Sequence, residues 1–201
     1  MKFLILGSNG FLGSYICNEL NNLSINYVPI NRELWNKLKD QNIGNWCLQN
    51  KITSIIFCSG YSKRFQAEEI ENIDELEVLN ILIKECNVKF IYLSSSLVYG
   101  LGRDSTNKKV SENSIVYPSG EYGMYKRLLE RIVLQSNENN CIMRLVSCIG
   151  KSKRSGLMQS IENQINNQKD VITMIHGNTT RDYLWVGYAA KIITQIALNP
   201  E

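Results

Sequence analysis

Short, unbroken apolar runs alternate with segments of helical periodicity along most of the chain. Such runs are typical of strands that are buried on both faces, and the segments between them repeat apolar residues every three or four positions. The predicted strands are 2–6, 27–30, 54–59, 89–95 and 141–147, and the predicted helices are 11–22, 67–86 and 119–136. Strands separated by helices indicate an α/β fold, and we expect a Rossmann-type doubly wound parallel sheet with helices on both faces.

The pattern changes near residue 151, which divides the chain into two expected parts. Residues 1–150 form the core, although the stretch 32–53 is less regular and a strand and a helix are expected to be shortened there. Residues 151–201 form a substrate-side segment and the last core helix. In this part we predict a helix at 155–168, a short strand at 171–175 and an amphipathic helix at 185–200.

The sequence GSNGFLG links the first predicted strand to the first predicted helix. In such a loop the first glycine permits a tight turn, the second lets the backbone approach a pyrophosphate, and the third allows close helix–strand packing. The helix start adds N–H groups for phosphate oxygens. An ordinary strand–helix turn is the alternative. The predicted cofactor-binding residues of the loop are Gly7, Asn9, Gly10, Phe11, Leu12 and Gly13.

The end of the second predicted strand bears on the choice of cofactor. An acidic residue there binds the ribose 2′-hydroxyl of NAD, whereas an arginine nearby accommodates the 2′-phosphate of NADP. This chain has the uncharged Asn31 followed by Arg32. We therefore favour NADP(H) over NAD(H), with both residues at the cofactor; if Arg32 points to solvent, the cofactor is NAD.

Tyr122 and Lys126 are four residues apart and share one face of the helix at 119–136. A nearby ammonium lowers the pKa of a phenol, which can then exchange a proton with a carbinol or a carbonyl. Ser94, Ser95 and Ser96 stand at the carboxyl end of the fourth predicted strand, where open α/β sheets bind their ligands. These residues indicate a catalytic acid/base pair with a neighbouring hydroxyl, and simple i,i+4 packing is the alternative.

Further motifs occur in the same order as in a known family. After the glycine loop come SSSLVYG (94–100), Pro118 before Tyr-x-x-x-Lys, RL (144–145) and RDYLWV (181–186). Over essentially its whole length the chain resembles the extended short-chain dehydrogenases/reductases of the NAD(P)-dependent epimerase/dehydratase group, which mostly act on nucleotide sugars.

The resemblance implies roles for particular residues. By resemblance, Ser95 would be the catalytic hydroxyl, with Ser96 as the alternative. Tyr122 would be the acid/base, and Lys126 would hold the nicotinamide ribose. The further residues implied at the cofactor are Cys58, Ser59, Gly60 and Ser94, and those implied at the substrate are Ser96, Ser147 and Arg181.

Departures from the family pattern narrow the expected reaction. Ser96 and Leu97 replace the acid pair of the 4,6-dehydratases, and His176 is the only histidine, which disfavours an enzyme that combines epimerisation with reduction through a Cys/His pair. We expect NADPH-dependent reduction of a nucleotide-linked keto sugar. The alternatives are an NAD-dependent 4-epimerase, another oxidoreductase and a non-catalytic NAD(P)-binding module. Family members are commonly longer, so the C-terminal substrate lid is expected to be truncated or absent.

Composition excludes several other classes. The chain has 201 residues and a formal charge of +3, with lysine and arginine spread along it, so we expect no nucleic-acid partner. No apolar stretch has the length of a membrane span, and six cysteines without paired spacing indicate reduced thiols in a cytoplasmic protein without a metal site. The resemblance also implies a homodimer, formed through the helix that carries Tyr122 and the helix that precedes it.

We expect the polar stretch 68–77 to be a solvated helix face.

Overall fold

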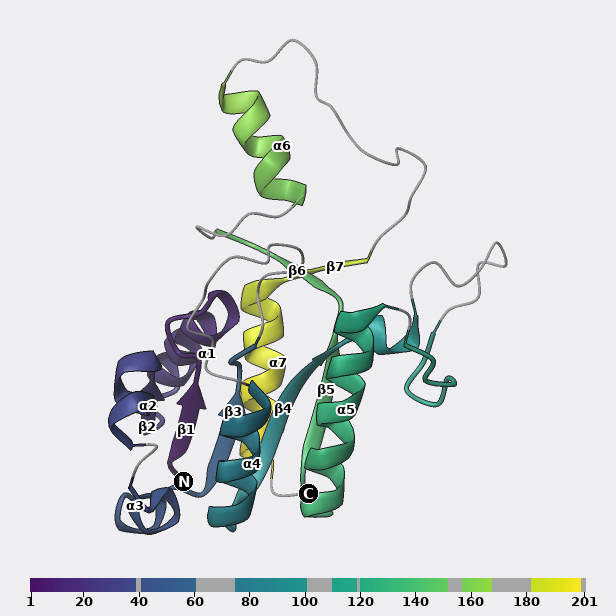
Figure 1. The fold of residues 1–201 in the computed structure, drawn as a ribbon. Helices are drawn as coiled ribbons and strands as arrows, with labels where there is room; N and C mark the ends of the chain where they lie inside the picture. Colours follow the sequence, from purple (N-terminus) through teal and green to yellow (C-terminus); the bar gives the residue numbers. More distant parts are fainter. Residues whose placement is uncertain are drawn as a thin grey trace.

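The computed structural model describes residues 1–38, 41–60, 75–100, 110–118, 120–151, 157–167 and 182–199. Five parallel strands form its central sheet in the order β2-β1-β3-β4-β5 (Figure 1). The strands are β1 (Phe3–Leu6), β2 (Tyr27–Ile30), β3 (Ser54–Phe57), β4 (Lys89–Ser95) and β5 (Cys141–Leu145). Two shorter parallel strands, β6 (Ser147–Ile149) and β7 (Tyr183–Trp185), pair beyond the carboxyl ends of the main sheet.

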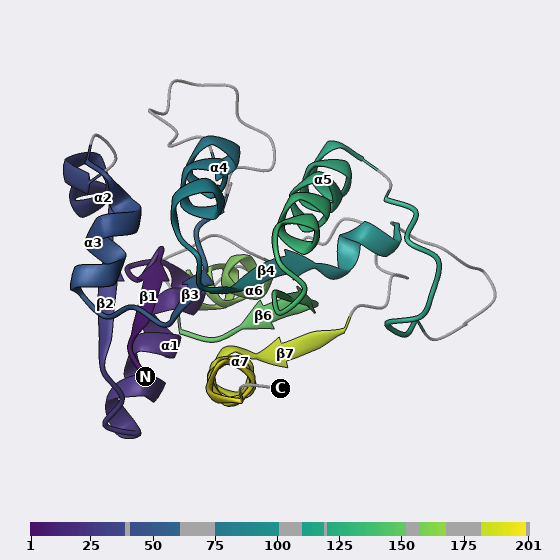
Figure 2. The ribbon, with the colours of Figure 1, turned by 90° about the horizontal axis from the view of Figure 1, so that it is seen from below.

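Helices cover both faces of the sheet, which confirms the predicted Rossmann-type α/β fold. The helices are α1 (Phe11–Asn22), α2 (Arg32–Leu38), α3 (Ile43–Gln49), α4 (Glu75–Glu85), the 3-10 helix η1 (Ser96–Tyr99), α5 (Glu121–Ser136), α6 (Leu157–Asn166) and α7 (Val186–Leu198). Viewed along the sheet, α1 and α7 lie on one side, and α2 to α5 lie on the other (Figure 2).

Alternate residues of each strand supply the two cores. Phe3 and Ile5 of β1 pack with α1 and α7, whereas Leu4 and Leu6 belong to the larger core under α2 to α5. Leu129 of α5 is fully buried in that larger core, and burial of such a side chain stabilises the fold by about 2 kcal/mol. Unbroken apolar strands are required because both faces are covered.

The chain reverses direction between β1 and β3. It runs outward from β1 through α1 to β2, then crosses back through α2 and α3 to β3 on the other side of β1. Open α/β sheets bind ligands beyond the carboxyl ends of the strands at such a point. In the described residues β2 is an edge strand, and its exposed Pro29 suits an edge because proline lacks a backbone N–H.

Most predicted elements agree with the structure except at their ends. In 32–53, where a shortened strand and a shortened helix were expected, the described residues form the two short helices α2 and α3 and no strand. The predictions for 11–22, 27–30 and 89–95 coincide with α1, β2 and β4. The predicted strand 141–147 is two strands, because the chain leaves the main sheet after Leu145 and pairs with β7 from Ser147. The strand predicted at 171–175 lies outside the described residues. Among the helices that the structure describes, none is both long and apolar enough to cross a lipid bilayer.

Candidate active site

The glycine loop directly follows β1 and packs tightly against the segment after β3. Gly7 has a φ of +79°, which strains other residues, and its carbonyl accepts a hydrogen bond from the Gly10 N–H at 2.8 Å. A β-carbon at Gly7 would lie 2.8 Å from the Ser59 backbone nitrogen, and one at Gly13 would overlap the Gly7 carbonyl oxygen. Both positions therefore need glycine, one for the turn and one for the packing.

The start of α1 offers hydrogen-bond donors beside this loop. Gly10 caps the helix without a side-chain acceptor, the first turn carries no acidic residue, and the first N–H groups of a helix have no partner inside it. Ser8 is 5% exposed, and its hydroxyl has no hydrogen-bond partner within the described part of the chain. A pyrophosphate fits this arrangement, because its oxygens accept hydrogen bonds and its charge suits the positive end of the helix dipole.

The residues after β3 lie across the switch point from the glycine loop. Cys58 and Ser59 are half-buried and Gly60 is exposed. Burial raises the pKa of the Cys58 thiol and the nearby Cys17 raises it further, so Cys58 is a neutral thiol. Cys58 can therefore line a cofactor but is poorly suited to act as a nucleophile.

Asn31 stands at the carboxyl end of β2, and its side chain caps the next helix. Its Oδ1 accepts a hydrogen bond from the Leu34 N–H at 2.8 Å, which is the N-cap arrangement for α2. Arg32 begins α2, and its side chain lies outside the described part of the molecule. The preference for NADP that was inferred from Arg32 therefore stays a prediction.

The first turn of α5 packs directly on η1 and sets Tyr122 beside the serine segment. A β-carbon at Gly123 would lie 2.7 Å from the Leu97 carbonyl oxygen, so only glycine permits this approach. Ser95 ends β4 and accepts a hydrogen bond from the Leu97 N–H at 3.2 Å, which caps η1. Tyr122 and Ser96 are both half-buried, on the two segments that meet.

Lys126 lies one turn beyond Tyr122 in a buried polar cluster. Its Nζ donates to Glu75 Oε1 at 2.7 Å and to the Tyr92 hydroxyl at 2.9 Å, and Tyr92 donates to the same Glu75 oxygen at 2.9 Å. Burial raises the pKa of Tyr92, and the charge of Glu75 raises it further, so Tyr92 remains a neutral phenol. The charges that Tyr122 and Tyr125 would carry as phenolates add to this rise, so both phenols are near the cluster.

The prediction that stretch 68–77 is a solvated face is wrong at Glu75. Residues 68–74 lie outside the described part of the chain, but Glu75 is 6% exposed and faces the sheet. A carboxylate can be buried there because Lys126 and Tyr92, which are distant in sequence, both bind it.

A second buried carboxylate, Glu130, fixes α5 to the sheet. Arg144 of β5 donates to both of its oxygens, Nε to Oε1 and Nη2 to Oε2, each at 2.9 Å. Ser94 donates to Glu130 Oε1 at 2.6 Å, and Arg127 donates to Oε2 at 2.9 Å. Because the Ser94 hydroxyl is engaged here, contact between Ser94 and the cofactor stays a prediction.

Arg144 also links this carboxylate to η1. Its Nη1 donates to the Tyr99 hydroxyl at 2.7 Å, and its guanidinium carbon lies 4.9 Å from the Tyr99 ring centroid. Neither Glu130 nor Tyr99 was predicted from the sequence to position the site. Helical spacing gave a signal for Glu130, which lies on the same α5 face as Tyr122 and Lys126 at successive intervals of four.

The remaining predicted site residues are less well placed by the structure. Ser147 is exposed at the start of β6, paired with Tyr183 of β7. Arg181 lies outside the described residues. Within the described ranges, no group of three His, Cys, Asp or Glu side chains could hold a metal ion.

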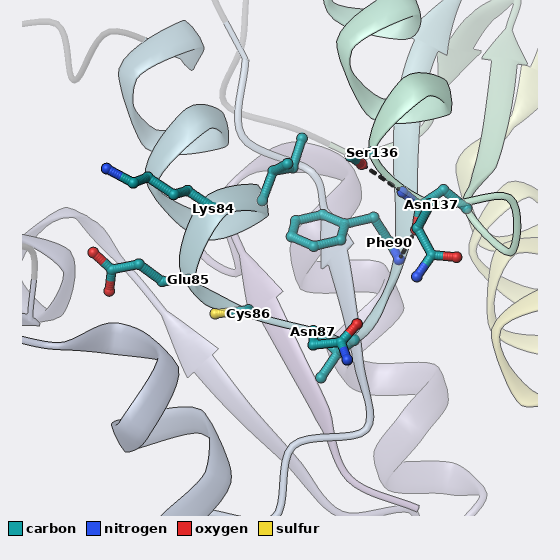
Figure 3. Close-up of a pocket in the computed structure, with 10 residues that line it drawn as sticks. Lys84, Glu85, Cys86, Asn87, Phe90, Ser136 and Asn137 are labelled. Atoms are coloured by element: carbon teal, nitrogen blue, oxygen red, sulfur yellow. Dashed lines mark hydrogen bonds between the residues drawn. The ribbon is translucent and has the colours of Figure 1, made fainter.

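A cavity of about 240 Å³ lies at the other end of the sheet (Figure 3). It is lined by Ile83, Lys84, Glu85, Cys86, Asn87, Val88, Phe90, Ser136, Asn137 and Asn140. These residues come from the C-terminal ends of α4 and α5 and the amino end of β4, whereas the glycine loop and Tyr122 are at the carboxyl end. The cavity is therefore separate from the candidate site.

Comparison with known proteins shows the family to which the chain belongs. A model of the NAD dependent epimerase/dehydratase family matches residues 3–201, and the chain belongs to that family. It is 24% identical, over an alignment of 236 residues, to the uncharacterized UDP-glucose epimerase YtcB of Bacillus subtilis (strain 168). That alignment covers 100% of this chain and 73% of the relative.

Solved structures share the fold at low sequence identity. A UDP-N-acetylglucosamine 4-epimerase from Bacillus cereus superposes with a TM-score of 0.78 at 19% identity, covering 98% of this chain and 71% of that protein. A dTDP-4-dehydrorhamnose reductase from Clostridium acetobutylicum gives 0.74 at 20% identity, covering 98% and 70%. A UDP-glucuronic acid 4-epimerase from Bacillus cereus, solved with UDP-glucuronic acid and NAD, gives 0.76 at 20% identity, covering 100% and 74%.

Proposed function

We propose that the chain is an NAD(P)-dependent oxidoreductase that acts on a nucleotide sugar, and that its reaction is the reduction of a keto sugar by NADPH. The observation that carries the proposal is the close packing of Gly123 on Leu97, which joins the Tyr122 turn to the Ser95–Ser96 segment. Both segments lie at the carboxyl end of the sheet, as does the glycine loop.

The cofactor would be held by groups on both sides of the switch point. The N–H groups at the start of α1 and the Ser8 hydroxyl would bind the pyrophosphate, and Cys58, Ser59 and Gly60 would line the cofactor. Lys126 would donate a hydrogen bond to a ribose hydroxyl. When bound, the nicotinamide supplies or accepts the hydride.

Tyr122 would carry the proton in this reaction. Its phenol would give a proton to the carbonyl oxygen during reduction and take one from the carbinol in the reverse direction, which is general acid/base catalysis. The Ser95 hydroxyl would donate a hydrogen bond to the same substrate oxygen and hold it against Tyr122. The pair needs no metal, since the phenol and the hydroxyl polarise the oxygen between them.

The relatives, rather than a pocket, support the proposed substrate class. The proteins named in the comparison are enzymes of UDP-linked and dTDP-linked sugars, and this chain shares their family or their fold. Ser96, Ser147 and Arg181 are the proposed substrate contacts.

The exposed apolar side chains of α5 support a homodimer through this helix. Met124 and Leu128 are 58% and 48% exposed, whereas Leu129 and Val133 are buried in the core.

A second candidate is an NAD-dependent 4-epimerase. The observation that favours it is the match of the whole chain to a relative named as a UDP-glucose epimerase. An epimerase oxidises and re-reduces the same carbon, so it uses the same phenol twice and recycles a retained cofactor. Net consumption of the reduced cofactor therefore separates the two reactions.

The experiment begins with fluorescence titration of the protein with NADPH and with NADH. Turnover is then followed by the absorbance of the reduced nicotinamide over a panel of 4-keto nucleotide sugars, and by product analysis with UDP-glucose. We expect the wild type to bind NADPH more tightly than NADH and Arg32→Ala to lose this preference. We also expect net oxidation of the cofactor during turnover. Equal affinity for the two cofactors in the wild type rejects the NADP preference. Sugar interconversion without net oxidation identifies the epimerase, and cofactor binding without turnover identifies a binding module.

A further inference from the structure

Lys126 has two of its three ammonium donors occupied by buried partners. The Lys126 and Glu75 side chains are each 4% exposed, and Nζ lies 2.7 Å from Glu75 Oε1. The Tyr92 hydroxyl accepts a second Nζ hydrogen bond at 2.9 Å. A lysine ammonium carries three N–H donors, so within the described part of the chain these two contacts leave the third N–H for a ligand.

Gly60 provides the space for that ligand. A β-carbon at Gly60 would lie 3.3 Å from Lys126 Nζ and 3.7 Å from each Glu75 oxygen, whereas glycine places no side chain of its own there. Gly60 is exposed at the carboxyl end of the sheet. A hydroxyl group that enters beside Gly60 therefore meets an ammonium donor and a carboxylate acceptor together, and a ribose presents hydroxyls of this kind.

The ammonium depends on its carboxylate partner. A buried charge without a counter-charge is strongly unfavourable, and removal of one member of a buried pair leaves the other uncompensated. Among the described neighbours, Tyr92 cannot replace Glu75, because burial raises the pKa of Tyr92 and keeps it a neutral phenol. Glu130 cannot replace it either, because Arg144 and Arg127 bind Glu130.

We propose that Glu75 is a positioning residue of the cofactor site, which anchors Lys126 Nζ together with Tyr92 so that its third N–H is held beside Gly60 for a ribose hydroxyl. This rests on the proposed function for the identity of the ligand. The anchoring itself is a property of the cofactor-free protein. Glu75 comes from α4, Tyr92 from β4 and Lys126 from α5, so the arrangement joins three elements at one point.

The test compares Glu75→Gln, Lys126→Met and the double variant with wild type, with Glu77→Gln as a control at an exposed position of the same helix. The first readout needs no cofactor: a proton–nitrogen correlation spectrum tuned to lysine ammonium groups, in which Lys126→Met assigns the Lys126 signal. We expect this signal in wild type and Glu77→Gln, because two hydrogen bonds and burial slow its proton exchange. We expect its loss in Glu75→Gln.

The second readout is the dissociation constant of the reduced cofactor. Glu75→Gln and Lys126→Met should each weaken binding about tenfold, the size of one charge-assisted hydrogen bond, and the double variant should be no weaker than Lys126→Met alone. Such non-additivity shows that Glu75 acts through Lys126. A role confined to folding would lower thermal stability without this pattern.

Two results would overturn the inference: a folded Glu75→Gln protein that keeps the Lys126 signal and wild-type affinity, or losses of affinity that add in the double variant. If Glu75→Gln fails to fold, Glu75→Asp keeps the charge and withdraws the carboxylate by one methylene, and wild-type affinity in that variant rejects the proposal. If wild type binds neither reduced cofactor, the proposed function fails and the ribose role fails with it, while the ammonium spectrum still decides whether Glu75 anchors Lys126.

Discussion

Gly123 of α5 lies so close to the Leu97 carbonyl of η1 that a β-carbon at Gly123 would come within 2.7 Å of the oxygen. This oxygen belongs to the backbone and cannot rotate away as a side chain could. A larger residue at position 123 must therefore displace α5 or η1. This contact fixes the separation between the turn that carries Tyr122 and the segment that carries Ser95 and Ser96.

Gly123→Ala is predicted to separate these two groups. Displacement by a fraction of an ångström at a catalytic pair lowers turnover steeply, and we expect a loss of at least about tenfold in kcat. Cofactor affinity should fall by no more than the roughly tenfold expected for loss of Lys126, because the glycine loop is on other elements and Lys126 is the proposed cofactor contact further along α5. Steady-state kinetics and a fluorescence titration measure the two effects. Arg131→Ala, an exposed position on the same helix, is the matched control, and wild-type kcat in Gly123→Ala would show that the contact does not set the geometry.

Gly13→Ala is predicted to damage the phosphate end of the site instead. The added β-carbon would overlap the Gly7 carbonyl oxygen, so the first turn of α1 must move away from the loop. We expect cofactor binding to weaken at least about a hundredfold, because several backbone N–H groups would no longer point at the phosphate oxygens. Ser14→Ala, at the next helix position, should bind as wild type does. Retained affinity in a folded Gly13→Ala protein would remove the loop from the cofactor site.

Glu130 gives the fold a predicted dependence on acid. Burial alone would raise the pKa of Glu130, but hydrogen bonds from Arg144, Ser94 and Arg127 outweigh burial and hold the pKa below its ordinary value. A carboxyl with a lowered pKa in the folded state stabilises the fold above its ordinary pKa, and this stabilisation is lost as the pH falls through the lowered value. Glu130→Gln should cost about 3 kcal/mol at neutral pH because it leaves Arg144 without its counter-charge.

Urea unfolding at several pH values measures this effect. The difference in free energy of unfolding between wild type and Glu130→Gln should shrink as the pH falls below about 4, where an unfolded glutamic acid is protonated. Glu138→Gln, at an exposed position after α5, should show no such trend. A difference that stays constant with pH would mean that the charge of Glu130 does not support the fold.

Most of the fold could be predicted from the sequence, because its strands and helices leave local patterns of apolar and polar residues. Buried parallel strands leave unbroken apolar runs, and the glycine loop marks the junction of β1 and α1, so α1, β2 and β4 could be predicted to the residue. The strand β7 was missed because its three residues precede α7 without a break in apolar character. The 3-10 helix η1 was missed because its cap is a side-chain hydrogen bond within the serine run.

The candidate site was predictable in its motif residues and not in their partners. Tyr122 and Lys126 stand out by spacing along one helix, whereas Glu75 meets Lys126 across 51 residues and Glu130 meets Arg144 across 14. Such pairs follow from the order of the strands and from which helix lies over which strand. From sequence alone, a charged residue in a polar stretch is therefore predicted to be exposed, because its distant partner is known only from the fold. The prediction for residues 68–77 was wrong at Glu75 for this reason.

Tyr122→Phe removes the phenolic hydroxyl that is proposed to transfer the proton. Turnover of the reduced cofactor with the best keto nucleotide sugar should fall at least about a hundredfold, the usual size of general acid/base effects, while the dissociation constant of the cofactor stays nearly unchanged. Tyr27→Phe, at the amino end of β2, controls for loss of a phenol elsewhere. Of these two variants, only Tyr122→Phe should lose turnover. Unaltered activity in Tyr122→Phe would show that Tyr122 does not transfer the proton.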